Sequence, residues 1–380
     1  MKKYYKILCI LLFISVLLNV AIFLPYIKPL YLKTINYLSP VEYFSKKESD
    51  TKVLLSVSNA ILTNKGRSVI MPMNEQRGLI QDLKTFFKPT RNNSINNNYY
   101  TSYALVGASY YALMNNDYMM MKELSEIANS FLTSDGKLNY EIQRIDQIPI
   151  GILYINLYKY YKKLKYKYIS DGIYEKVKSM RNNDGIIYYI NSHTCQFSDV
   201  LGMYVPFLME YFTLSKDSVA YEIVNYNIRQ FYKYGVNKET GIPFHGYNIK
   251  NKVPVGSSNW GRGIGWYLLA LAYFPSFNDS ILDSTIKSLN YSQFPCSDRR
   301  FDSSTAIMFE IYKQARDNNR CLSLDFIKPH IRINGFVDGC SGDTYNLNDY
   351  SHIFGESELC NGLLLILASK FSNLSYKKIK

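Results

Sequence analysis

Six apolar helical segments recur along the chain beyond residue 90. In each segment, small, aromatic and leucine residues occupy every face of a helix, a pattern typical of helices buried on more than one side. The segments begin at residues 103, 148, 201, 264, 305 and 360, so each repeat has about the length of one helical hairpin with its loop. They are Tyr103–Leu113, Ile148–Tyr161, Leu201–Phe212, Ile264–Phe274, Thr305–Ala315 and Cys360–Phe371.

Amphipathic or polar helical stretches lie between these segments and predict an outer layer of helices. Together, six inner and six outer helices predict an all-α fold, an (α/α)6 toroid. An open helical solenoid and a helix bundle are the alternatives. A solenoid exposes its end repeats, whereas the last repeat here is as apolar as the central ones, which favours a closed ring. The outer stretches are Tyr118–Leu132, Asp171–Met180, Ser218–Tyr234 and Ser280–Leu289.

The N-terminus predicts a membrane anchor. Residues Ile7–Ile27 form a run of 21 positions without a charge, long enough as a helix to cross a hydrocarbon core of roughly 30 Å. A cleaved signal peptide is the alternative, but it would have a shorter apolar region and a small-x-small cleavage site. The lysines ahead of the run place the N-terminus in the cytoplasm and the large domain on the extracytoplasmic side, in the cell envelope. We therefore divide the chain into a signal anchor or transmembrane helix (1–28), a membrane-proximal tether with the first helices (29–90) and the toroid (91–380).

Charge and cysteine content exclude several classes of protein. The net charge of +13 suits polyanionic partners, but the lysines are scattered and no nucleic-acid-binding motif accompanies them, so we predict no nucleic-acid partner. The six cysteines include no CxxC pair and no Cys/His cluster with zinc spacing, so no metal is predicted. Apart from Cys9 in the apolar run, the five remaining cysteines are an odd number and are predicted to be buried free thiols.

Polar residues precede most of the inner helices. In a toroid, the N-termini of these helices meet at one funnel. A single Asp or Ser at such a position is most simply a helix cap. Two carboxylates, an arginine and two tryptophans converging on one cavity exceed what capping requires, so we predict the active site there. The residues are Asp146, Asp199, Trp260, Arg262, Asp302, Ser303, Ser304, Glu356 and Glu358.

The segment Ser257–Leu269 (SSNWGRGIGWYLL) contains both tryptophans of the chain. Its glycines Gly261, Gly263 and Gly265 weaken a helix by roughly 1 kcal/mol each relative to alanine, which indicates a close approach of backbone or ligand. No strand precedes the segment and no Lys-Ser/Thr follows it, so it is neither a dinucleotide-binding motif nor a P-loop.

Three motifs together resemble glycoside hydrolase families 88 and 105, the unsaturated glucuronyl and rhamnogalacturonyl hydrolases. They are Lys238–Tyr247 (KETGIPFHGY), Trp260–Trp266 (WGRGIGW) and the DVLGMYVPFL segment that begins at Asp199. The resemblance extends over roughly Tyr99–Phe371. Because these families have the (α/α)6 toroid, it agrees with the repeat pattern.

The resemblance implies roles for individual residues. Asp199 matches the general acid and base of these families, and Asp146 matches their second active-site aspartate. His245, Trp260, Arg262 and Trp266 match substrate-binding positions. The chain departs from the families in two places that leave the sugar open: Ile264 stands where an asparagine is usual, and the aromatic residue near the catalytic aspartate is Phe197, which we also expect to bind substrate.

The implied reaction is hydration of the C4=C5 double bond of an unsaturated uronic acid in an oligosaccharide or polysaccharide. Protonated Asp199 would donate to C4, water would add at C5, and the resulting hemiketal would open and expel the rest of the sugar. Arg262 would pair with the carboxylate of this anionic substrate, or else form a structural salt bridge to a funnel carboxylate. No cofactor is required. The alternatives are a membrane-tethered glycan-binding protein that is non-catalytic or biosynthetic, and another toroid enzyme such as an epimerase or a hydrolase of saturated glycans.

Overall fold

The structure is a computed structural model. The chain forms two compact units, residues 1–43 with 76–90 and residues 44–75 with 91–380. It describes residues 4–20, 41–63, 98–189, 194–258, 260–288, 301–317, 321–342, 344, 347 and 354–372. Residues 4–20 are helical, and the rest of the predicted span Ile7–Ile27 lies outside the described residues. Within the described part of the chain, no helix has both the length and the apolar character needed to cross a bilayer.

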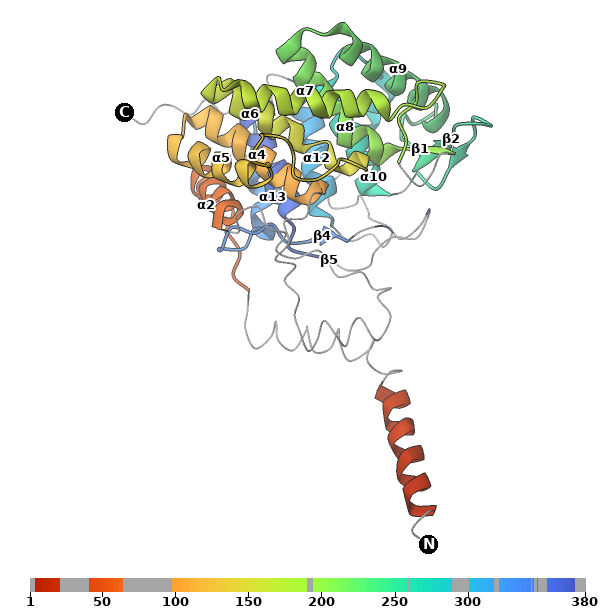
Figure 1. Ribbon diagram of the computed structural model, residues 1–380. Coiled ribbons are helices and arrows are strands. Elements are labelled where there is room, and N and C mark those ends of the chain that lie inside the picture. The colour runs from red at the N-terminus through yellow and green to blue at the C-terminus, as the bar shows by residue number, and fades with distance from the viewer. Residues whose placement is uncertain are drawn as a thin grey trace. The chain divides into compact units, whose positions relative to one another are not determined.

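Among the described residues, the contacts between helices define a closed ring of six inner helices, which are labelled in Figure 1. Each contacts the next in chain order, and the last contacts the first. Every predicted apolar segment lies in one of them, except that Ile148 and Pro149 precede the second helix and Phe274 follows the fourth. The six are α4 (Tyr99–Asn115), α6 (Ile150–Tyr161), α8 (Ser198–Ser215), α10 (Gly261–Tyr273), α12 (Ser303–Arg316) and α13 (Glu358–Ile366), the last continued by a π-helical turn, η5 (Leu367–Phe371).

The closing contact of the ring depends on two glycines. Gly107 of α4 and Gly362 of α13 face each other so closely that a Cβ atom at position 107 would lie 2.6 Å from the Cα of Gly362. No real Cβ approaches another backbone this closely, so the two helix backbones meet only because neither residue has a side chain. The chain thus closes as a toroid rather than continuing as an open solenoid.

Outer helices pack against this ring, and their amphipathic pattern explains why. In α2 (Asp50–Thr63), the buried residues Val53, Leu54, Val57 and Ile61 follow helical spacing and face α13 and α4. The other outer helices contact inner ones in the same way: α5 (Tyr118–Ser130), α7 (Leu164–Ser179), α9 (Ser218–Gly235) and α11 (Ser280–Ser288). Between α12 and α13 the described chain contains two short 3-10 helices, η3 (Leu324–Phe326) and η4 (Lys328–His330).

Four return turns share one design that the apolar pattern did not predict. Each contains an isolated antiparallel bridge and a glycine with positive φ, a backbone conformation that favours glycine. The glycines are Gly136, Gly185, Gly241 and Gly335, at φ of +80°, +76°, +70° and +87°. Three of the turns directly follow the outer helices α5, α7 and α9, and the fourth follows η4. They bring the chain back toward the ends where the inner helices begin.

Short strands complete the loops at this end of the ring. The strands β1 (Cys195–Phe197), β2 (Gly246–Asn248) and β3 (Pro254–Val255) form an antiparallel sheet in the order β1-β2-β3. A second antiparallel pair joins β4 (Cys340–Ser341) to β5 (Phe354–Gly355). Because β1 leads directly into α8, the first sheet fixes the chain just ahead of Asp199.

The described cysteines are all free thiols. Cys195, Cys340 and Cys360 are buried, as predicted, whereas Cys321 is exposed. Cys9, in the apolar N-terminal run, is also exposed. Cys296 lies outside the described residues.

Candidate active site

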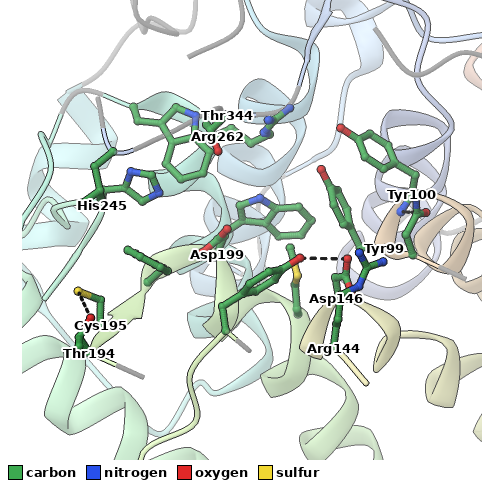
Figure 2. A pocket seen from close by; sticks show the side chains of 17 residues that line it. Tyr99, Tyr100, Arg144, Asp146, Thr194, Cys195, Asp199, His245, Arg262 and Thr344 are labelled. Atoms are coloured by element: carbon green, nitrogen blue, oxygen red, sulfur yellow. Dashed lines mark hydrogen bonds and ion pairs between the residues drawn. The ribbon is translucent and has the colours of Figure 1, made fainter. Parts of the chain in front are cut away.

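A pocket of about 650 Å³ lies where α4, α6, α8 and α10 begin (Figure 2). The seven residues to which the sequence assigned catalysis or substrate binding all line this pocket: Asp146, Phe197, Asp199, His245, Trp260, Arg262 and Trp266. They come from three consecutive repeats, those of α6, α8 and α10, and the packing of these neighbouring helices brings them together. The other lining residues are Asn98, Tyr99, Tyr100, Arg144, Tyr189, Thr194, Cys195, Met203, Thr344 and Leu347.

Asp199 lies in the first turn of α8, immediately after β1. One oxygen of its carboxylate accepts the main-chain N–H of Val200 at 2.9 Å. Burial raises the pKa of this carboxyl from 3.8 to about 6; main-chain hydrogen bonds and Arg262 oppose the shift, while Asp146 adds to it. The cost of desolvating the charged form therefore outweighs the stabilisation that a helix N-terminus gives to a carboxylate. Near pH 6 this side chain is available both as a proton donor and as a base.

Asp146 lies in the short helix η1 (Ile145–Gln147) just ahead of α6 and is almost fully buried. One carboxylate oxygen accepts the Tyr189 hydroxyl at 3.2 Å, and the other lies 3.2 Å from Nε of Arg144. Figure 2 shows Arg144 beside Asp146 at the pocket. The Arg144 side chain is 48% exposed, so the guanidinium contacts both Asp146 and the open space of the pocket.

The sheet positions His245 against two aromatic rings. Phe197 pairs with Gly246 across the β1–β2 ladder, and the carbonyl of His245 accepts the N–H of Ser198 at 2.8 Å. The imidazole ring centre lies 4.3 Å from that of Trp260 and 5.3 Å from that of Phe197. Burial lowers the pKa of His245 to about 4, so the ring is neutral near pH 7.

Arg262 is buried and bonded to main-chain carbonyls rather than to a carboxylate. Its two terminal nitrogens donate to the carbonyl oxygens of Ser341 and Gly342, each at 2.5 Å. Its guanidinium also lies 5.9 Å from the centre of the Trp260 ring. Arg262 therefore ties the chain after β4 to the start of α10, and Thr344 and Leu347 line the pocket just beyond this connection.

Trp266 is mostly a packing residue. It is only 1% exposed, and its ring contacts those of Tyr99 and Tyr103 at centroid distances of 5.6 Å. A Cβ added to Gly202 of α8 would lie 2.6 Å from the Trp266 ring, so the two helices meet at this side chain. The glycines of the same motif also serve close packing, because a side chain at Gly263 would overlap the Trp260 ring.

Several other polar residues ahead of inner helices do not line the pocket. Asp302 caps α12 by accepting the N–H of Ser304 at 2.9 Å, and its other oxygen accepts the hydroxyl of Ser341 at 2.7 Å. Glu356 forms an ion pair with Arg332 at 2.8 Å. Glu358 lies in the first turn of α13. Among the described residues, no group of three His, Cys, Asp or Glu side chains is arranged to hold a metal ion.

Sequence reasoning missed the aromatic and basic residues that complete the pocket. Asn98 caps α4 with its side chain, and Tyr99 and Tyr100 follow it directly. These three residues stand at the start of an inner helix, so they carry the same signal in the sequence as the funnel residues of the other repeats. Arg144 is two residues before Asp146, whereas Tyr189 follows a return turn and had no signal in the sequence.

The fold is a helical toroid with a polar, aromatic-lined pocket at one end, and comparison with known proteins identifies the family. The sequence pattern of glycosyl hydrolase family 88 matches residues 79–285, more than half of the chain. The protein belongs to glycosyl hydrolase family 88, as the sequence motifs predicted.

Solved structures with similar folds include several carbohydrate enzymes. A family 105 glycoside hydrolase of C. acetobutylicum ATCC 824 is 16% identical, with a TM-score of 0.60 over 76% of this chain and 98% of that one. An unsaturated glucuronyl hydrolase specific for heparin is 13% identical, with a TM-score of 0.58 over 84% and 96%. An α-1,6-mannanase of Salegentibacter sp. HEL1_6 is 14% identical, with a TM-score of 0.51 over 82% and 98%. At these identities the likeness establishes the fold alone.

Proposed function

We propose that this family 88 protein hydrolyses oligosaccharides or polysaccharides that end in an unsaturated uronic acid, by hydration of the C4=C5 double bond. The observation that carries this proposal is Asp199, whose pKa burial raises to about 6 in a pocket that also contains Asp146. Addition to an enol ether requires a carboxyl group that is protonated before the reaction and basic afterwards. A carboxyl with this pKa meets both conditions near neutral pH.

The proposed reaction consists of proton transfer, addition of water and release of the remaining saccharide. The Asp199 carboxyl transfers its proton to C4, and positive charge develops at C5, where the ring oxygen shares it. Water then forms a bond to C5, and its released proton returns to the Asp199 carboxylate. The resulting hemiketal opens to a ketone at C5 as the bond between C5 and the ring oxygen breaks, and the proton of the C5 hydroxyl moves to that oxygen, which leaves a hemiacetal at C1. The hemiacetal then becomes an aldehyde as the bond between C1 and the glycosidic oxygen breaks, and the remaining saccharide leaves with that oxygen and the hemiacetal proton. Asp146, held by Arg144 and Tyr189, places a negative charge close to the developing cation.

The geometry favours Arg144 over Arg262 as the partner of the substrate carboxylate. The terminal nitrogens of Arg262 are already bonded to two carbonyl oxygens. Arg144 contacts Asp146 through Nε, and its side chain lines the pocket and is 48% exposed. A guanidinium held in this way can bind a carboxylate in a bidentate manner. The neutral His245 ring and the Trp260 ring, which are tilted by 48° to each other, then provide an aromatic wall for the sugar.

The test is turnover of oligosaccharides generated by polysaccharide lyases, followed as loss of the ultraviolet absorbance of the conjugated double bond. Galacturonate, glucuronate and glycosaminoglycan series together represent the main unsaturated uronides. The expected result is loss of absorbance with at least one series and release of a shortened saccharide. If saturated oligosaccharides are cleaved while every unsaturated one is left intact, the protein is a different hydrolase. Binding without turnover would make it a glycan-binding protein.

We also propose that the N-terminal apolar run anchors the enzyme to a membrane, with the toroid on the extracytoplasmic side. The support is the uncharged run from Ile7 to Ile27, together with the lysines that precede it. Deletion of residues 1–28 should move the protein from the membrane fraction to the aqueous fraction. If the truncated protein stays with the membrane after a salt wash, the anchor lies elsewhere or is absent.

A further inference from the structure

A second cleft of about 580 Å³ lies on the outer face of the toroid, away from the active-site pocket. It lies between α7 and the return turn after α5, and it shares no lining residue with the pocket. We call it the α7 cleft. It is lined by Asp135, Gly136, Lys137, Leu138, Tyr140, Glu141, Ile142, Lys165, Tyr168, Ile169, Gly172, Ile173 and Lys176.

Four residues form a stripe along the open face of α7. Lys165, Tyr168, Gly172 and Lys176 are spaced by three, four and four residues, so they lie on the same face of the helix. The stripe places a lysine at each end, an aromatic ring that is 64% exposed, and a bare stretch of backbone between them. At helical rise its length is roughly 16 Å. The cleft is therefore elongated, with a lysine at each end of the stripe.

Gly172 has no structural reason to be glycine. It lies in the interior of α7, where glycine lowers helix stability relative to alanine. A Cβ at this position would meet no atom within 4 Å, in contrast to the tight helix contacts at Gly107 and Gly202. The fold would therefore accept a side chain here, and its absence keeps the middle of the cleft open beside the Tyr168 ring. This is the arrangement expected where a ligand approaches the backbone closely.

The chemistry of the walls selects the ligand. Ile169 and Ile173 are buried beneath the stripe, which gives the cleft an apolar floor for the C–H faces of a sugar ring. The lysines are held by few contacts: Lys176 lies 3.2 Å from Glu141, which is 70% exposed, and Lys165 donates to Asn129 at 2.8 Å and lies 4.9 Å from the centre of the Tyr166 ring. Exposed ion pairs contribute little, so a ligand carboxylate can replace Glu141 at low cost.

We propose that the α7 cleft is a second glycan-binding site that takes a short segment of an acidic polysaccharide, with a sugar ring on Tyr168 and carboxylates at Lys165 and Lys176. It would hold the polymer on the outer face while chain ends react in the pocket. The proposal does not depend on the hydration chemistry, because a saturated uronic acid chain would bind equally well.

Calorimetric titration of the full-length protein with saturated uronic acid tetrasaccharides tests this proposal, because such chains have no double bond for the pocket to hydrate. The probes are tetragalacturonate, an alginate tetrasaccharide and a chondroitin tetrasaccharide, with cellotetraose as the neutral control. Gly172→Leu fills the cleft with a good helix former. We expect it to weaken binding of the anionic probes at least tenfold and to raise the melting temperature. Tyr168→Ala should weaken binding similarly, and turnover of short unsaturated substrates should remain unchanged in both variants.

The matched control is Tyr118→Ala, which removes a tyrosine of similar exposure, 59%, that does not line the cleft. It should leave binding unchanged. The proposal is overturned if none of the anionic probes binds, if cellotetraose binds as tightly, or if Gly172→Leu and Tyr168→Ala bind like the wild type. Binding of the wild type to anionic lipid vesicles that Gly172→Leu abolishes, without binding to any tetrasaccharide, would assign the cleft to a membrane surface instead. If the wild type binds the anionic tetrasaccharides but does not turn over any unsaturated substrate, the proposed hydration reaction is wrong and the second binding site stands.

Discussion

Replacement of Asp199 by asparagine tests the catalytic assignment and gives two measurable effects of opposite sign. Asparagine has the same shape and can still accept the N–H of Val200, but it cannot donate or recover a proton. General acid–base catalysis contributes typically about 100- to 10,000-fold, so turnover of an unsaturated uronide should fall at least about a hundredfold. The fold should become more stable.

The gain in stability follows from the raised pKa. A shift from 3.8 to about 6 corresponds to roughly 3 kcal/mol between the protonated and ionised forms. Because the folded state binds the proton more tightly than the unfolded state, stability is lost as pH rises through this interval, and the full penalty is present at pH 7. The asparagine of the variant has no charge to desolvate. At pH 7 the variant should therefore unfold at a higher urea concentration, by up to about 3 kcal/mol in free energy of unfolding.

The pH dependence of kcat/KM provides an independent readout. With a pKa of about 6, roughly a tenth of Asp199 is protonated at pH 7, against less than about one molecule in a thousand at the ordinary value of 3.8. The wild-type rate should be highest below pH 6 and should fall about tenfold per pH unit well above it. The residual rate of the variant should lack this alkaline limb.

Asp117→Asn is the matched control. Asp117 caps the outer helix α5 by accepting the N–H of Met120 at 3.0 Å and does not line the pocket. Its replacement should leave turnover and its pH profile unchanged. If the Asp199 variant retains more than a tenth of the wild-type rate and is no more stable than the wild type at pH 7, Asp199 is only a helix cap and the reasoning fails.

Three further predictions concern the stability of the toroid. Burial acts to raise the pKa of Glu210, but the ammonium groups of Lys370 and Lys159 lower it to about 2. Glu210→Gln should therefore lower the free energy of unfolding in urea by about 2 to 4 kcal/mol at pH 7. An unchanged urea midpoint at this pH would contradict this prediction. The contribution of Glu210 should be present above pH 4.5 and be lost as pH falls toward 2. Burial lowers the pKa of His245 from 6.5 to about 4, so protonation in the unfolded state should lower the free energy of unfolding by up to about 3 kcal/mol as pH falls from 6.5 to 4. His245→Asn should flatten this part of the curve of stability against pH. The prediction is wrong if the slope of that curve is unchanged. Trp266→Ala should lower stability by about 3 to 5 kcal/mol, and a loss of affinity with an unchanged melting temperature would assign the ring to the substrate instead.

Much of the fold follows from local sequence patterns. An inner helix needs apolar residues on every face, and this requirement is visible in segments such as Leu201–Phe212 without knowledge of their neighbours. The same holds for the helix starts, since polar residues ahead of most apolar segments, Asp146 and Asp199 among them, predicted the end of the ring at which the pocket lies. By contrast, the return turns gave only a weak signal, because their common element is a single glycine with positive φ in each of four otherwise different loops.

The tertiary structure decided what each site residue contacts. The sequence predicted that Arg262 lies at the funnel, but its bonds go to carbonyl oxygens about 80 residues away, at Ser341 and Gly342. Little of the Trp266 ring is exposed to the pocket, because Gly202 of another repeat has no side chain and leaves space for the ring in the core. Periodicity specifies which face of a helix is buried. It does not specify which neighbour fills the space, because that depends on the packing of helices distant in the chain.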